Sequence, residues 1–130
     1  LGNEFYYRKD FKSAILQFEK ALEYARIGFS YRDERWTFMH YYSLASMNLA
    51  QALSCYQQQP QSEKVLSDAH FNMLSVMVNQ SEPLKLRYEA RVQAELLLKN
   101  LIDFLVSMGR NKVADSLVEE FTRLKITHST

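Results

Sequence analysis

The sequence has few of the residues that would indicate a disulfide-stabilised, turn-rich or membrane-spanning protein. Cys55 is the one cysteine, so an internal disulfide is excluded and a reducing compartment is indicated. The 130 residues include only three glycines and two prolines, which argues against a β fold with many tight turns. There is no run of about 18 apolar residues, so no transmembrane helix is predicted.

The charges are almost balanced. Lys and Arg together number 16, Asp and Glu number 15, and the formal net charge is +1. Nucleic-acid-binding proteins usually carry a basic excess or a basic stripe, and membrane-surface helices a basic face, so neither partner is favoured. The hydrophobic content of 47% is ordinary for a globular domain. We predict a single domain over residues 1–130, located in the cytoplasm or the nucleus.

Patterns typical of catalysis or cofactor binding are missing from the sequence. His40, His70 and His128 lie in different segments, and no pair has the spacing of metal ligands. No phosphate-binding glycine loop, nucleophile motif or zinc motif is present. We therefore predict no catalytic residues, no metal site and no cofactor. Cys55 lies in an apolar segment and is expected to be a buried small side chain.

Apolar residues recur with a helical period between short polar breaks, which predicts an all-α fold. The pattern gives a helical stub at residues 1–8, followed by five helices. The predicted ranges are Asp10–Ile27, Asp33–Gln57, Ser62–Val78, Leu84–Met108 and Asn111–Leu124. Asp10 and Ser81 suit helix N-caps, and Gly109 suits the glycine that follows a helix C-terminus.

Two of these predicted helices are longer and more apolar than the others. The segment Asp33–Gln57 is apolar nearly all round, so we expect it to be covered on more than one side. The segment Leu84–Met108 keeps one charged stripe at four-residue steps. The stripe consists of Arg87, Arg91, Glu95, Lys99 and Asp103. It is interpreted either as a solvated face held by ion pairs along the helix or as one wall of a partner-binding groove.

The most specific motif stands at the start of the chain. It combines small and aromatic residues at fixed steps: Gly2, Phe5, Ala14, Phe18 and Ala21. This pattern resembles a tetratricopeptide repeat, from the middle of its first helix through its second. The resemblance implies that Gly2 and Ala14 permit close helix contacts, that Phe5 and Phe18 fill the space between helices, and that Ala21 lets the next repeat dock.

A weaker match occurs near the end, where Gly109, Ala114, Val118 and Phe121 resemble the close of a last repeat. The resemblance implies packing roles for Gly109, Ala114 and Phe121. The resemblance implies an α-solenoid of antiparallel helix pairs with long helices, in repeat units of roughly 1–28, 31–79 and 83–126. The spacing of about 50 residues between matching positions exceeds that of a standard repeat. Because the motif begins midway, we expect the front of its first helix to precede Leu1, as in a piece of a longer array.

The resemblance also implies where a partner would bind, because groove residues come from the first helix of each pair. These candidates are Asn3, Tyr6 and Tyr7 in the first pair and Arg87, Arg91, Glu95 and Lys99 in the last. The leading hypothesis is a non-catalytic module that binds a peptide or helix of another protein on a concave surface. Residues Tyr31–Tyr42, which are rich in aromatic side chains, are interpreted as core or as part of that interface.

Two other functions stay open at this point. The chain would serve as a structural segment of a scaffold or multi-subunit complex if its open ends packed on neighbouring repeats or on a second copy. The minor alternative is a helical-repeat protein that binds nucleic acid, which the near-neutral charge disfavours.

Overall fold

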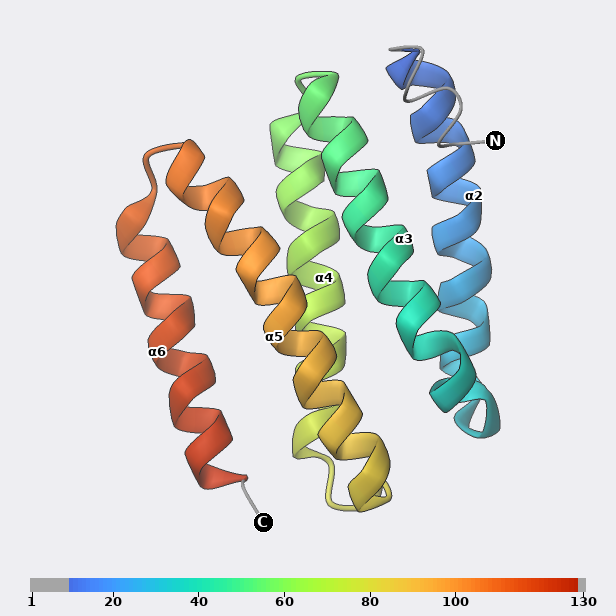
Figure 1. Ribbon diagram of the computed structural model, residues 1–130, viewed down its shortest axis with the longest axis vertical. Helices are drawn as coiled ribbons and strands as arrows, with labels where there is room; N and C mark the ends of the chain where they lie inside the picture. Colours follow the sequence, from blue (N-terminus) through green and yellow to red (C-terminus); the bar gives the residue numbers. More distant parts are fainter. Residues whose placement is uncertain (1–9, 129–130) are drawn as a thin grey trace. The chain divides into compact units, whose positions relative to one another are not determined.

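The computed structural model describes residues 10–128, and these residues form an all-α fold (Figure 1). Within this range there are five α-helices, one short 3₁₀-helix and no strand. The elements are α2 (Phe11–Ser30), η1 (Arg32–Glu34), α3 (Arg35–Cys55), α4 (Gln59–Val78), α5 (Leu84–Ser107) and α6 (Asn111–Thr127). The predicted helical class is confirmed, whereas the tetratricopeptide arrangement stays a prediction.

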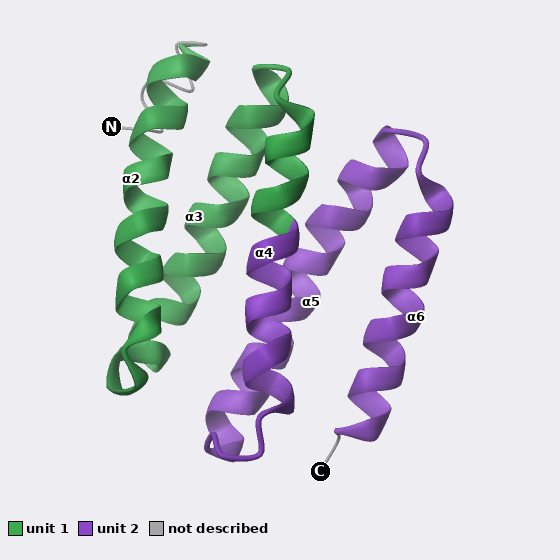
Figure 2. Cartoon of the chain, turned by 180° about the vertical axis from the view of Figure 1, so that it is seen from behind, with its two compact units in different colours: residues 1–66 green, residues 67–130 purple. Residues whose placement is uncertain are grey.

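The chain divides into two compact units, Leu1–Leu66 and Ser67–Thr130 (Figure 2). The division falls inside α4, so each unit contains one helix pair and part of that helix. Unit 1 holds the pair α2 and α3, and unit 2 holds the pair α5 and α6. The repeat boundaries expected near residues 28 and 79 do not coincide with this division and stay predictions.

The core of unit 1 forms where α2 meets α3. Ala14 is fully buried and Phe18 is nearly so, and both belong to one cluster with three buried residues of α3. Those residues are Leu49, Ala52 and Leu53. Ala14 and Ala52 have small side chains, which let two helix backbones approach closely. The packing roles predicted for Ala14 and Phe18 agree with their burial.

The packing role predicted for Ala21 is wrong within this structure. Ala21 is exposed, while Ala25, one turn further along α2, is buried. Beyond Ala25 the buried face continues to Phe29, whose ring meets Tyr42 of α3 edge-on at 5.1 Å between centroids. Ala21 therefore lies on a part of α2 that none of the described helices covers.

Helix α3 is buried on more than one side because many of its residues are small. Its buried residues are Met39, Tyr42, Ser43, Ala45, Ser46, Leu49, Ala50, Ala52 and Leu53. Besides the α2 contact, the buried hydroxyl of Ser62 in α4 donates a hydrogen bond of 2.7 Å to the carbonyl oxygen of Ala50. Large side chains of α3 nevertheless remain at the surface, among them Trp36, Tyr41 and Leu44. The helix is covered on two sides, but not all round.

The predicted N-cap residue is found at the start of α2 but not at the start of α5. The Asp10 carboxylate accepts a hydrogen bond of 3.2 Å from the backbone N–H of Ser13, so the predicted N-cap is confirmed. Ser81 is not an N-cap, because α5 begins only at Leu84 and Pro83 occupies the cap position. Asn79 instead holds the turn, since its side-chain oxygen accepts the N–H of Ser81 at 2.9 Å.

Two helix ends share one hydrogen-bonding pattern. After α5, Gly109 has φ of 75°, its N–H donates to Val106, and the N–H of Arg110 donates to Leu105. This is the C-terminal glycine expected from the sequence. A side chain at Gly109 would meet open space, so the packing role that the repeat resemblance implied for it is wrong. After α3, Gln57 takes the same place with φ of 61°.

Cys55 is the last residue of α3 and is exposed, so the expectation of a buried thiol is wrong. The helix ends there, and the chain turns away at Gln57 before another helix can cover this position. Helix α4 then begins at Gln59, three residues earlier than predicted, with Pro60 in its first turn, where proline is well tolerated.

The core of unit 2 forms where the end of α4, α5 and α6 come together. Small Ala90 and Ala94 of α5 are fully buried, and Met73 of α4 is buried as well. Ala114 and Phe121, which the resemblance assigned to packing, are both buried on α6. The remaining apolar residues of α6 are half-exposed or exposed, so this helix contributes a narrow strip to the core.

Candidate functional site

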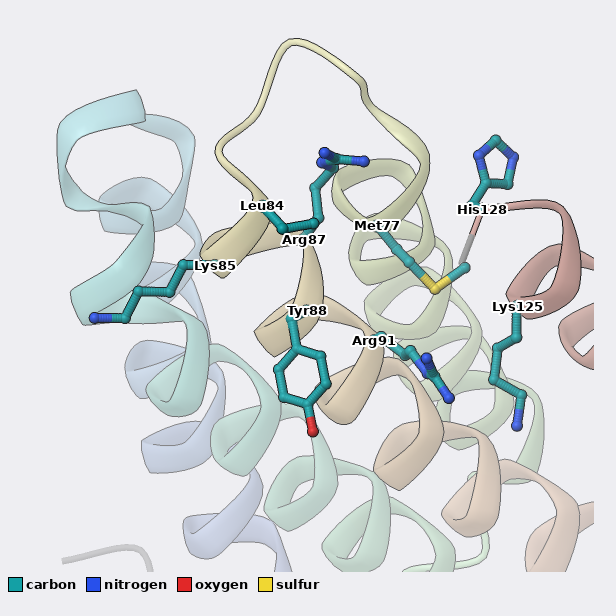
Figure 3. Close-up of a pocket in the computed structure, with 8 residues that line it drawn as sticks. All are labelled: Met77, Leu84, Lys85, Arg87, Tyr88, Arg91, Lys125 and His128. Atoms are coloured by element: carbon teal, nitrogen blue, oxygen red, sulfur yellow. The ribbon is translucent and has the colours of Figure 1, made fainter. Parts of the chain in front are cut away.

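A cavity of about 610 Å³ lies within unit 2, at one end of the helix pair α5 and α6 (Figure 3). It is lined by Met77, Leu84, Lys85, Arg87, Tyr88, Arg91, Lys125 and His128. These residues come from the end of α4, the first two turns of α5, and the end of α6 with the residue that follows it. Its volume is within the range of about 300–1,000 Å³ found for ligand sites.

Helical geometry explains why these residues meet. The lining positions of α5, residues 84, 85, 87, 88 and 91, recur at the steps that place side chains on one helix side. The short connection after Ser107 makes α6 run antiparallel to α5, so the end of α6 and the start of α5 lie at the same end of the pair (Figure 1). Lys125 is thereby brought next to residues more than thirty positions earlier in the chain.

The lining is basic and apolar. Four cations line the cavity, namely Lys85, Arg87, Arg91 and Lys125, and no Asp or Glu is among the described lining residues. Met77, Leu84 and the Tyr88 ring supply apolar surface. Because α5 also begins here, the partial positive charge of its N-terminus adds to that of the side chains. The charges of the lining side chains and of the α5 N-terminus together favour an anionic ligand.

The two arginines are held differently. The Nε of Arg87 donates to the carbonyl oxygen of Glu82 at 3.1 Å, and its Nη1 lies 3.5 Å from Oε1 of Gln80, so the side chain turns toward the preceding loop. Arg91 is exposed and forms no ion pair or hydrogen bond with any other described residue. Figure 3 shows its guanidinium directed toward the α6 side, where Lys125 also lies.

Lys125 connects the cavity to the core. Its Nζ lies 3.3 Å from Oε1 of Glu95 and 4.8 Å from the centroid of the Phe121 ring. Glu95 is largely exposed, so this ion pair contributes at most about 1 kcal/mol to stability. Its effect is positional, because it holds the Lys125 ammonium at the edge of the cavity.

The predicted groove residues have different outcomes. Arg87 and Arg91 line the cavity, Glu95 binds Lys125 beside it, and Lys99 does not line it. None of the ion pairs expected along the charged stripe occurs among the described residues, and Glu95 pairs with Lys125 of α6 instead of with Arg91 or Lys99. The other groove candidates, Asn3, Tyr6 and Tyr7, and the packing candidates Gly2 and Phe5 lie outside the described residues, as does the predicted stub 1–8.

Sequence reasoning missed six members of this site, namely Met77, Leu84, Lys85, Tyr88, Lys125 and His128. Tyr88 stands one residue after Arg87 on the same face of α5, so the helical period could have identified it. Met77, Lys125 and His128 come from the end of α4, the end of α6 and the residue after it, and no local pattern in the sequence connects them to α5.

A buried histidine holds the three helices of unit 2 together behind this site. His70 of α4 donates from Nδ1 to the carbonyl oxygen of Ala94 in α5 at 2.9 Å. Its ring meets the Phe121 ring of α6 edge-on, with 5.8 Å between centroids. Desolvation by burial lowers the pKa of His70, while the hydrogen bond to Ala94 and the charge of Glu120 oppose that change. His70 is therefore a neutral structural side chain at neutral pH.

The lowered pKa of His70 makes the stability of unit 2 depend on pH. Below the ordinary value of 6.5, the unfolded chain takes up a proton more readily than the folded chain does. We expect the free energy of unfolding to fall as the pH drops from about 7 to about 5. Urea denaturation followed by circular dichroism measures this. The matched variant His70→Asn should be less stable at pH 7 and should show a smaller pH dependence; an equal dependence would contradict the assignment.

The aromatic residues of Tyr31–Tyr42 divide between core and surface. Tyr42 is buried against Phe29, whereas Tyr31, Trp36 and Tyr41 are exposed. The exposed members lie in unit 1.

Neither a metal site nor a membrane span is found among the described residues. Residues 10–128 contain no group of three or more His, Cys, Asp or Glu side chains arranged to hold a metal ion. None of the described helices combines the length and the apolar character that crossing a lipid bilayer requires. No protein-family model, no curated protein and no solved structure matches the chain. The resemblance to tetratricopeptide repeats therefore stays a prediction.

Proposed function

We propose that the chain is a non-catalytic interaction module that binds a peptide or helical segment of a partner protein, and that the cavity of unit 2 receives this segment. The observation that carries the proposal is the composition of the cavity, in which apolar surface and several cations from two helices converge. Binding sites commonly combine an apolar lining with a few polar groups that orient the ligand.

The residue types in the cavity support a protein partner. Tyr and Arg are enriched among the residues that dominate binding energy at protein interfaces, and Tyr88, Arg87 and Arg91 supply both types here. Met77 adds a flexible apolar side chain, which adapts to different partner side chains. The volume would hold one or two large side chains of a partner, with the rest of its chain outside.

The resemblance to tetratricopeptide repeats is consistent with this function, because such repeats present peptides or helices of partners on a concave surface. If the resemblance holds, α5 is the first helix of a pair, and the side of α5 that lines the cavity belongs to the binding groove. We place the module in the cytoplasm or the nucleus, since its single cysteine suits a reducing compartment.

A peptide library displayed on phage and selected on the immobilised chain tests this function. We expect the enriched peptides to bind the wild type and to lose binding to Leu84→Trp. That substitution fills the cavity without changing its charge, and Leu84 is exposed, so the fold should tolerate it. The control is Val106→Trp, an exposed position of α5 outside the cavity. If no peptide is enriched, or if Leu84→Trp binds the peptides as well as Val106→Trp does, the proposal is wrong.

A structural role in a larger assembly is the second candidate, and the outer face of α6 favours it. Val118 is 41% exposed and Ile126 is 73% exposed, and both line a shallow depression of about 400 Å³. Exposed apolar residues that lie together often mark a surface for another protein or another copy. Light scattering over a range of concentrations tests this role: self-association that Ile126→Glu abolishes would support it, and a monomer at every concentration would exclude a second copy.

A further inference from the structure

We infer that the cavity of unit 2 selects an acidic segment of a partner protein, in which an apolar or aromatic side chain is flanked by carboxylates. This inference rests on the proposed function and adds the chemistry of the ligand. It is derived from three features of the cavity: the sign of its charge, the confinement of that charge, and one arginine that has no partner among the described residues.

The sign of the charge is the first feature. Arg87 and Arg91 of α5 and Lys125 of α6 approach the cavity from two helices. No Asp or Glu is among the described lining residues, and Glu95 at the edge pairs with Lys125 alone. Cations gathered in a concave site attract an anion more strongly than the same cations on a flat surface, because the low-dielectric walls concentrate the field. A ligand that brings carboxylates would complement this charge.

The second feature is that the basic charge is confined to the cavity. This favours a short acidic segment over a nucleic acid as the ligand. Glu95 pairs with Lys125 at the edge of the cavity, and the chain as a whole carries a formal charge of only +1. A nucleic acid brings a continuous row of phosphates, and its binding needs an extended basic surface. The apolar part of the lining, Met77, Leu84 and the Tyr88 ring, instead suits a side chain that lies between a few carboxylates.

Arg91 is the residue that we expect to recognise the acidic group directly. Its planar guanidinium can donate two parallel hydrogen bonds to one carboxylate, a geometry that lysine cannot provide. Arg87 is partly occupied by the backbone of Glu82, and Lys125 by Glu95, whereas Arg91 has no such contact among the described residues. Figure 3 shows Arg91 between the Tyr88 ring and the α6 side of the cavity.

Fluorescence anisotropy with synthetic peptides tests the inference on the whole chain. The probe is a labelled peptide with tryptophan between Asp and Glu residues, and its comparison peptide has Asn and Gln in their place. We expect the acidic peptide to bind at least about tenfold more tightly, which corresponds to about 1.4 kcal/mol. Arg91→Glu should reduce its affinity by at least about tenfold, and added salt should weaken it further.

Lys99→Glu is the matched control. It makes the same change in net charge on the same exposed stripe of α5, but it lies outside the cavity. We expect it to alter the affinity by less than about twofold, because charges separated by more than about 10 Å are screened at ordinary salt. Equal losses in Arg91→Glu and Lys99→Glu would show a general charge effect and would overturn the inference.

Two other outcomes separate the inference from the function it rests on. If the acidic and amide peptides bind equally, and Leu84→Trp abolishes both, the cavity binds peptides but the acidic preference is wrong. If a labelled single-stranded RNA binds more tightly than the acidic peptide and depends on Arg91, the cavity recognises phosphate and the inference is overturned. If the acidic peptide still binds to the Leu84→Trp variant, its binding site lies outside the cavity, and both proposals are contradicted.

Discussion

Replacing Ala14 by Asp is expected to destabilise unit 1 by about 3–5 kcal/mol, the range that accompanies an uncompensated buried charge. Ala14 is fully buried against α3, in a cluster whose other members are all apolar. Its position in the second turn of α2 lets the helix dipole offset only about 0.3–1 kcal/mol of that cost. Since domains are stable by about 5–15 kcal/mol, the variant should lose much of its stability.

Chemical denaturation followed by the fluorescence of Trp36 measures this loss, because Trp36 is the one tryptophan and lies in unit 1. Ala21→Asp is the control on the same helix. It introduces the same side chain at an exposed position, so we expect a change below about 1 kcal/mol. Similar losses in the two variants would mean that α2 packs through a different face.

Replacing Phe121 by Ala is expected to destabilise unit 2 by about 3–5 kcal/mol, the usual cost of removing a buried phenyl ring. Phe121 is the one large side chain of α6 that is fully buried among the described residues, and it meets the His70 ring. The Lys125 ammonium also lies over the face of the Phe121 ring. The variant should therefore lose affinity for the acidic peptide as well as stability, because α6 would no longer hold Lys125 at the cavity.

Circular dichroism during urea denaturation measures the stability, and the anisotropy titration measures the binding. Val118→Ala is the matched control, since Val118 is an exposed apolar residue of the same helix, and its loss should stay below about 1 kcal/mol. If Phe121→Ala were no less stable than Val118→Ala, α6 would not be anchored through this ring.

The helices were predictable because the apolar period is a local property of the sequence. All five predicted helices occur in the described residues, with ends that differ by a few positions at most. The deviations have local causes. Helix α2 continues through Gly28 to Ser30, three residues past the predicted end. Gly28 lies against the Phe38 ring, and a Cβ at this position would collide with that ring. The turn before α5 is held by Asn79, so Ser81 is not needed as a cap.

Long-range packing was predictable only in part. A helical period identifies the apolar face of α2, but it does not show how far α3 covers that face, and Ala21 and Ala25 are equivalent in the pattern. The candidate site shows the same limit. The charged stripe identified Arg87 and Arg91, whereas Lys125 and Met77 reach the cavity only through the antiparallel packing of α6 and the end of α4.

The central claim is that a partner segment binds in the cavity at the start of α5 and the end of α6. Nuclear magnetic resonance of the isotopically labelled chain, titrated with the acidic peptide, tests it most directly. We expect the largest chemical-shift changes at Met77, Tyr88, Arg91 and Lys125, with little change in α2 and α3. Shift changes concentrated in α2 and α3, or on the outer face of α6 around Val118 and Ile126, would contradict the claim.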